Sequence, residues 1–139
     1  MKQDLILLPL IAMVILTFIV GMVMLKLRFK AVKEDGLNPG YFLLNRGAKL
    51  PDNLAKVTNH YANLFEMPLL FYIFCLAIYA GQRTDFTYIT IAWLFAVVRY
   101  FHAYIHTTYN DLKHRRFSFL IGSVLLASMW IRLGIQIVS

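Results

Sequence analysis

The chain has 139 residues, of which 60% are hydrophobic, and its mean hydropathy is +0.63. This composition excludes an ordinary soluble domain and indicates an integral membrane protein, which we expect to form one domain over residues 1–139. The formal net charge is +7, but the basic residues cluster beside the ends of apolar segments. We therefore expect them to set the topology and to contact anionic lipid, and we expect no nucleic acid partner.

Four apolar segments are each long enough to form a membrane-spanning helix. At about 1.5 Å per helical residue, roughly 20 residues cross a hydrocarbon core of about 30 Å. The segments that meet this requirement are residues 5–27, 54–80, 86–107 and 117–138. The sequence therefore predicts an all-α membrane protein whose four helices form an up-down-up-down bundle.

The first two segments each carry one feature that bears on this prediction. The apolar run of the first is longer than the roughly 7–15 residues of a signal-peptide core, and no small-residue cleavage site follows it, so we expect a retained helix. The second contains Pro68, which has no N–H to donate to the carbonyl of Leu64. This proline predicts a bend in the second helix.

Lysine and arginine residues in the connections indicate the orientation. One group lies at or between the first and second segments, and a smaller group lies between the third and fourth. The groups are Lys26, Arg28, Lys30, Lys33, Arg46, Lys49 and Lys56, and then Lys113, Arg115 and Arg116. Because basic connections remain in the cytoplasm, both termini are predicted on the opposite side.

Polar residues recur at helical spacing within the two middle segments. The second segment carries Asn59, Asn63 and Glu66, and the third carries Arg99, His102 and His106. An ionisable side chain at membrane depth usually faces the interior of a bundle or a cavity. Each segment therefore presents one polar face to its neighbours.

The predicted topology brings several of these residues to one side of the membrane. The cytoplasmic ends of the four helices bring together a pocket-sized set of polar groups: Lys26, Arg28, Asn59, Asn63, His106, Tyr109, Arg115 and Ser118. Glu66 and Arg99 lie deeper, and we predict a structural ion pair between them because either charge alone would be costly there. Asn59 and Asn63 could instead serve only as hydrogen-bonding contacts between helices.

Histidine and cysteine residues provide little evidence for a metal or a disulfide. His60 lies at a different helical angle from Asn59 and Asn63, so we expect a packing histidine. A haem or metal bound by His60, His102 and His106 is the weaker alternative, because the last two share a face and cannot take opposite axial positions on one haem. We expect no metal, and the lone Cys75 excludes a disulfide within the chain.

Two motifs resemble the MAPEG family, the membrane-associated proteins of eicosanoid and glutathione metabolism. They are Asn63-Leu64-Phe65-Glu66-Met67-Pro68, followed by an aromatic-rich stretch, and Arg99-Tyr100-Phe101-His102. The resemblance covers nearly the whole chain, including the four segments and the long basic first loop. It implies a homotrimer of four-helix bundles that binds glutathione as a co-substrate between neighbouring subunits near the cytoplasmic face.

The resemblance also implies roles for individual residues. Arg115 falls where the family has the arginine credited with activating the thiol, and Ser118 could assist it. Glutathione would be held by Lys26, Asn59, Asn63, Glu66, His102 and His106. A thiolate is the reactive form of a thiol, so such a site must lower the thiol pKa.

The chain departs from the family pattern at several of these positions. Glutathione-binding members usually have arginine at Asn59, and the prostaglandin synthase type adds one at Ala62; His106 replaces a tyrosine. Two functions follow as predictions. The first is a glutathione-dependent transferase or peroxidase in a bacterial inner membrane, with periplasmic termini, acting on lipophilic substrates drawn from membrane lipid. The alternative is a non-catalytic protein of the same fold that binds lipid or serves as a subunit of a larger complex.

Overall fold

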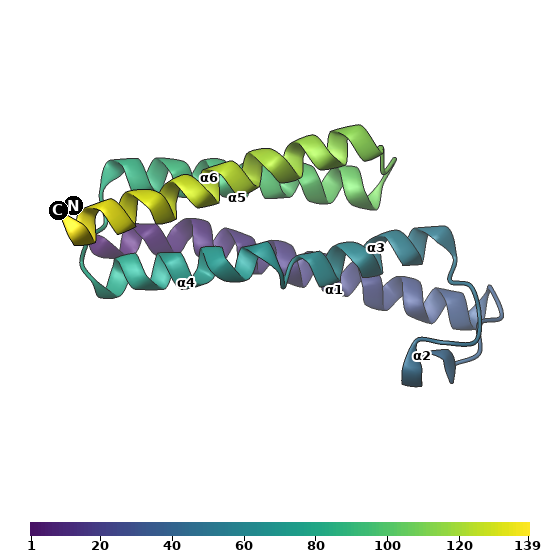
Figure 1. Cartoon of the computed structure of the whole chain (residues 1–139). Coiled ribbons are helices and arrows are strands. Elements are labelled where there is room, and N and C mark those ends of the chain that lie inside the picture. Colours follow the sequence, from purple (N-terminus) through teal and green to yellow (C-terminus); the bar gives the residue numbers. More distant parts are fainter.

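Helices are the only regular secondary structure in the computed structural model, which describes residues 1–139. The elements are η1 (Gln3–Ile6), α1 (Leu7–Lys33), α2 (Tyr41–Leu44), α3 (Asp52–Asn63), α4 (Met67–Ala80), α5 (Phe86–Thr107) and α6 (Leu112–Val138). Four stretches are long and apolar enough to cross a membrane: Gln3–Lys33, Asp52–Ala80, Phe86–Thr107 and Leu112–Val138. The predicted all-α fold with four spans is confirmed, and both termini lie at the same end of the bundle (Figure 1).

The four spans pack around a narrow apolar core as two antiparallel pairs: α1 with the second span, which consists of α3 and α4, and α5 with α6. The α5–α6 hairpin lies along α1 and the α3–α4 pair, and α1 and α3 extend beyond the α5–α6 turn (Figure 1). The core contains Phe71 and Phe74 of α4 and Phe95 of α5, and the stacked rings of Phe71 and Phe95 have centroids 4.4 Å apart. Many large apolar side chains point outward from every span. Such an outer surface suits hydrocarbon and would be unusual in water.

Two helices are longer than the apolar segments that predict them. The first was expected to end at residue 27, but α1 continues to Lys33; the fourth was expected from residue 117, but α6 begins at Leu112. Asp111 caps α6 by accepting a hydrogen bond from the His114 N–H at 3.0 Å. Hydropathy detects the part of a helix inside hydrocarbon, whereas the basic ends of α1 and α6 remain helical beyond it.

The second span is interrupted, not merely bent, between α3 and α4. Pro68 cannot supply the N–H that the carbonyl of Leu64 would accept in a continuous helix. The chain instead forms tighter turns, in which the Phe65 N–H bonds to the Ala62 carbonyl at 3.0 Å and the Glu66 N–H bonds to the Asn63 carbonyl at 3.2 Å. Asn63 therefore ends α3, and the single predicted helix over residues 54–80 is corrected to two.

An ion pair between Arg132 and Asp85 stabilises the end of the bundle at which both termini lie. Arg132 of α6 donates two hydrogen bonds to the carboxylate of Asp85, at 3.0 and 2.5 Å, and its guanidinium lies 4.1 Å from the centre of the Tyr88 ring. Partial burial alone would raise the pKa of Asp85. The hydrogen bonds from Arg132 and from the Tyr88 N–H outweigh this effect and hold the pKa of Asp85 below its usual value of 3.8.

Replacing Arg132 with alanine should lower the free energy of unfolding in detergent by about 1 kcal/mol, because the Asp85 carboxylate loses both charged hydrogen bonds and the pair is partly screened by solvent. The folded-state pKa of Asp85 is depressed, so its contribution is present above about pH 4 and is lost as the pH falls through the folded pKa. Thermal unfolding at neutral pH and at acid pH measures both effects. Arg83→Ala, which removes an exposed arginine at the same end, is the control. Equal stability of the two variants would contradict the assignment.

Candidate functional site

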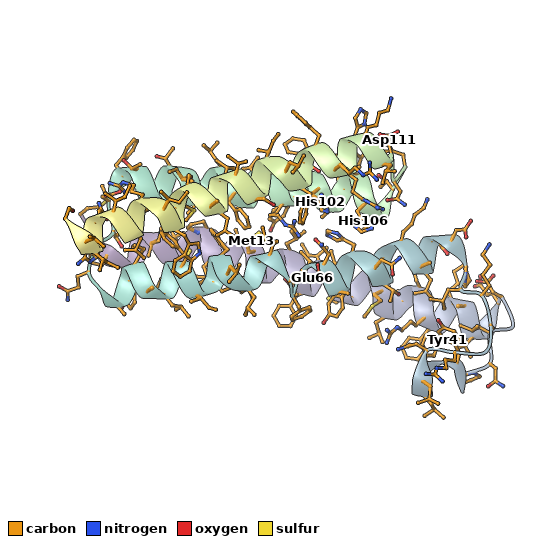
Figure 2. The ribbon with its side chains drawn as sticks, in the orientation of Figure 1. Met13, Tyr41, Glu66, His102, His106 and Asp111 are labelled. Atoms are coloured by element: carbon orange, nitrogen blue, oxygen red, sulfur yellow. The ribbon has the colours of Figure 1, made fainter.

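Polar side chains from α3, α5 and α6 meet beside the break in the second span. Figure 2 shows His102 and His106 of α5 between the two helix pairs, with Glu66 at the break across from them. On α5 the helical spacing places Arg99, His102 and His106 on one buried face. Asn63, the last residue of α3, lies opposite this face and accepts a hydrogen bond from Arg99.

Arg99 and Glu66 are joined through Asn63 and do not form the predicted direct ion pair. The Arg99 guanidinium donates a hydrogen bond to Asn63 Oδ1 at 2.5 Å, and Asn63 Nδ2 donates to Glu66 Oε2 at 3.3 Å. The interruption after Asn63 leaves the Glu66 side chain at the exposed surface. Arg99 is almost fully buried, and its Nε has no hydrogen-bond partner. Asn63 is therefore the main partner of a buried cation.

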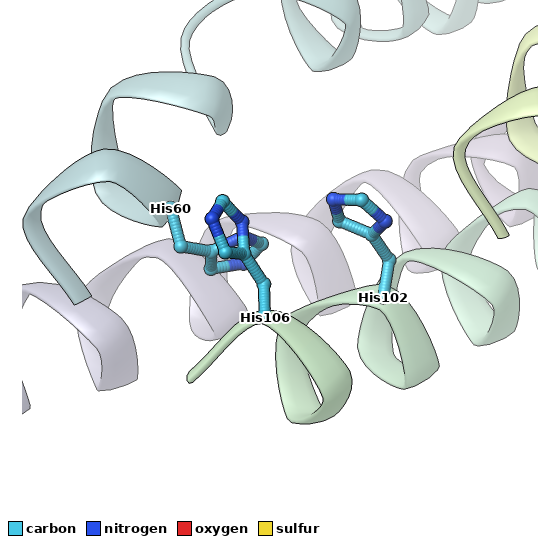
Figure 3. A group of neighbouring side chains, drawn as sticks. All are labelled: His60, His102 and His106. Carbon is cyan, nitrogen blue, oxygen red and sulfur yellow. The ribbon is translucent and has the colours of Figure 1, made fainter. Parts of the chain in front are cut away.

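Three histidines form a compact buried group that the sequence pattern did not predict. His60 of α3 faces His102 and His106 of α5 (Figure 3), and the Nδ1 atoms of His60 and His106 are 3.1 Å apart. The ring centroids of His60 lie 5.5 Å from His102 and 5.0 Å from His106. His60 was expected to be a packing histidine separate from the polar face, but α3 turns it toward the histidines of α5. Its position depends on how α3 packs against α5, which spacing within one helix does not show.

Ser118 holds His102 in place from α6. The Ser118 hydroxyl lies 2.9 Å from His102 Nδ1 and donates a hydrogen bond to the Arg115 carbonyl at 3.0 Å. The hydroxyl has one hydrogen, which it donates to the Arg115 carbonyl. The contact with His102 is therefore a hydrogen bond when His102 Nδ1 carries a hydrogen and Ser118 Oγ accepts that bond. The side chain is buried behind the histidine, and it therefore acts as a positioning group for His102.

A polar cavity of about 350 Å³ opens next to the histidines. Its lining residues are Asn63, His102, His106, Arg115, Arg116, Phe119 and Leu120. The Arg115 guanidinium donates to Asn110 Oδ1 at 2.9 Å, which fixes it at the rim. The volume lies within the range of about 300–1,000 Å³ that is usual for small-molecule sites. Three depressions are larger, at about 600, 490 and 440 Å³. The first two are lined almost wholly by apolar and aromatic groups, and the third by four residues at the end of the chain that include no ionisable side chain, which makes all three poor candidates for chemistry.

The structure brings together some of the predicted ligand-binding residues and leaves others apart. Asn63, His102, His106 and Arg115 share the cavity, and Arg116 joins them. Glu66 touches the group only through Asn63. The side chains of Lys26 on α1 and Asn59 on α3 are exposed and do not line this cavity. A single chain therefore brings together only some of the residues that were predicted to bind glutathione.

The fold and the cavity define a class of protein: a multi-pass helical membrane protein with a cationic, histidine-lined pocket between its helices. The model of the MAPEG family matches residues 6–135, and the chain belongs to this family. No curated protein and no solved structure matches the chain. Family membership supports a membrane function in the glutathione or eicosanoid chemistry of the family in general, without indicating a particular activity.

Proposed function

We propose that the protein is a glutathione-dependent membrane transferase or peroxidase that acts on lipophilic electrophiles. The observation that carries this proposal is the cavity in which Arg115 and Arg116 lie beside Asn63 and two histidines, with Phe119 and Leu120 at its edge. Glutathione carries two carboxylates, one ammonium group, amides and a thiol. Guanidinium groups bind carboxylates through paired hydrogen bonds, and amide and imidazole groups can hold the peptide backbone.

The remaining predicted contacts suit a site shared between copies of the chain. Lys26, Asn59 and Glu66 have exposed side chains, so a neighbouring copy can approach all three. In the homotrimer that we propose, Lys26 of one copy would supply a further cation to the cavity of the next. Asn63, His102 and His106 would bind the peptide from within the same chain.

Arg115 is the residue that we assign to thiol activation. A guanidinium group beside the sulfur favours the thiolate, which lowers the thiol pKa toward neutral pH. The thiolate then attacks the electrophilic atom of the substrate, and the leaving group departs with its bonding electrons. Phe119 and Leu120 offer an apolar approach from the bilayer to the same cavity. Ser118 has no contact with the thiol in this account and keeps His102 in place.

We also propose the orientation that the basic connections indicate, in a bacterial inner membrane. The cavity lies toward the α5–α6 turn, which carries Lys113, Arg115 and Arg116. With that turn in the cytoplasm, the cavity faces the compartment where reduced glutathione is available, and both termini lie in the periplasm.

The experiment that tests this function is an activity assay on protein purified in detergent. We expect conjugation of glutathione to chlorodinitrobenzene, reduction of a lipid hydroperoxide with glutathione as the reductant, or both, in proportion to protein concentration. Boiled protein and glutathione alone provide the background rates. Neither reaction above background, together with a stoichiometric lipid or protein that co-purifies, would favour the non-catalytic alternative.

A further inference from the structure

We propose that His60, His102 and His106 form a binding site for a divalent transition metal ion, with Zn²⁺ as the preferred ion. Each residue can offer one ring nitrogen so that the three nitrogens lie within 4.8 Å of one another. All three side chains are buried, and they come from two helices that the fold holds in contact (Figure 3). Imidazole is a ligand that suits zinc, copper, nickel and iron.

The spacing of two of these nitrogens is close to that in a metal site. His60 Nδ1 and His106 Nδ1 are 3.1 Å apart. Two ligands of one tetrahedral zinc ion, each at about 2.0–2.1 Å from it, are separated by roughly 3.3 Å. The His60–His106 pair is therefore already close to ligand spacing, whereas the His102 nitrogen, which lies within 4.8 Å of the other two, would have to move closer to them.

His60 also has a hydrogen-bonding problem that packing alone does not solve. Its side chain is fully buried, its only polar neighbour at hydrogen-bond distance is His106, and its Nε2 has no partner. Whichever nitrogen carries the proton, the neutral ring leaves one buried donor or acceptor unpaired. Buried polar groups nearly always have a partner, so this ring is poorly satisfied as a packing group. An ion bound at Nδ1 would replace the contact with His106 and would leave the Nε2–H unpaired.

His102 is already held in a form that can bind a metal. Its Nδ1–H donates to Ser118 Oγ at 2.9 Å, and the Ser118 hydroxyl donates its own hydrogen bond to the Arg115 carbonyl. The lone pair of the neutral ring is then on Nε2, which accepts a hydrogen bond from glutathione when no metal is present and binds the ion when the site is loaded. Histidine ligands of metals usually donate their second ring nitrogen to a fixed acceptor in this way, which orients the ring.

Three protein ligands leave a fourth position on the ion. His102 and His106 both line the polar cavity, so this position faces the cavity and can hold a water molecule or a thiolate. Arg115 and Arg116 line the same cavity, so their guanidinium groups lie beside this fourth position. Their charges favour an anion, such as hydroxide or thiolate, as the fourth ligand. The sequence favoured no metal here, because His102 and His106 share a face and cannot take opposite axial positions on one haem.

The test uses full-length protein in detergent, purified without a histidine tag, stripped with chelator and kept free of glutathione. We expect one Co²⁺ per chain, with the strong visible absorption of tetrahedral Co²⁺, and its displacement by Zn²⁺. We also expect Zn²⁺ to raise the melting temperature, since the ion binds the folded state. No saturable Co²⁺ or Zn²⁺ binding would overturn the proposal.

The chain offers a matched control because His114 is its fourth histidine and is exposed. His60→Ala should weaken Zn²⁺ binding by at least tenfold, and Ser118→Ala by about tenfold through loss of the bond that orients His102. His114→Ala should bind like the natural protein. If His60→Ala does not fold, His106→Asn provides the same test. Unchanged Zn²⁺ affinity in a folded His60 or His106 variant would contradict the site. Because these measurements contain no glutathione, an absence of metal binding would not count against the proposed glutathione-dependent activity.

Discussion

Arg115→Ala should lower kcat/KM for glutathione conjugation by about 100-fold or more. In our account the guanidinium stabilises the negative charge on the glutathione sulfur, and loss of one such group from a reacting centre typically costs about 10²–10³-fold in rate. Arg115 is held at the cavity by its bond to Asn110, so its charge is already in position before the ligand binds. Arg115→Lys should recover part of the rate, because the charge remains but the planar donor group is lost.

The matched control for Arg115 is Lys113→Ala. Lys113 is an exposed basic residue on the same helix, two positions earlier, and it does not line the cavity. The Lys113→Ala variant should keep the activity of the natural protein with chlorodinitrobenzene and with a lipid hydroperoxide. Full activity of Arg115→Ala with both substrates would remove Arg115 from the mechanism, provided that thermal unfolding shows both variants to be folded.

Asn63→Leu should lower the free energy of unfolding by about 3 kcal/mol. Leucine has a similar size but removes the oxygen that accepts the hydrogen bond of Arg99. Arg99 is almost fully buried and its Nε is already unpaired, so the variant would leave a cation with no hydrogen-bonding side chain on α3. Removing one partner of a buried charged group is costly because the charge stays in a medium of low polarity.

Unfolding in detergent, followed by circular dichroism, measures the effect of Asn63 independently of any activity. Asn59→Leu is the control, since Asn59 lies one helical turn earlier on α3 with an exposed side chain, and it should change the stability by no more than about 0.5 kcal/mol. Asn63→Asp should lose less stability than Asn63→Leu, because a carboxylate still accepts from Arg99 although it no longer donates to Glu66. A stable Asn63→Leu protein would show that Arg99 does not depend on this partner.

Much of the fold can be predicted because a bilayer restricts what a chain can do. Each backbone polar group in hydrocarbon must be satisfied within its own segment, so long apolar segments become helices. The helix ends are less predictable: α1 extends to Lys33 and α6 starts at Leu112, since polar residues near the membrane surface can stay helical. Pro68 indicates a distortion, but the extent of the break depends on the turns that replace the missing bond.

The candidate site is only partly predictable for a similar reason. Helical spacing identifies the face that carries Arg99, His102 and His106, and the structure confirms that this face is buried. Spacing gives no information on which residues of another helix meet that face. His60 therefore lies beside the histidines of α5, a grouping that the sequence offered only as the weaker alternative, and Asn63 takes the place beside Arg99 that Glu66 was expected to fill. Lys26 and Asn59 stay predictions, because their roles need a neighbouring chain.

The binding of glutathione to the purified protein tests the central claim most directly. Calorimetry should show saturable binding at neutral pH, and the ultraviolet absorbance of the thiolate should rise in the same sample. Arg115→Ala should abolish the rise in absorbance while leaving some binding through Asn63, His102 and His106. No heat of binding at millimolar glutathione, and no thiolate signal, would contradict the account and favour a lipid-binding or subunit role.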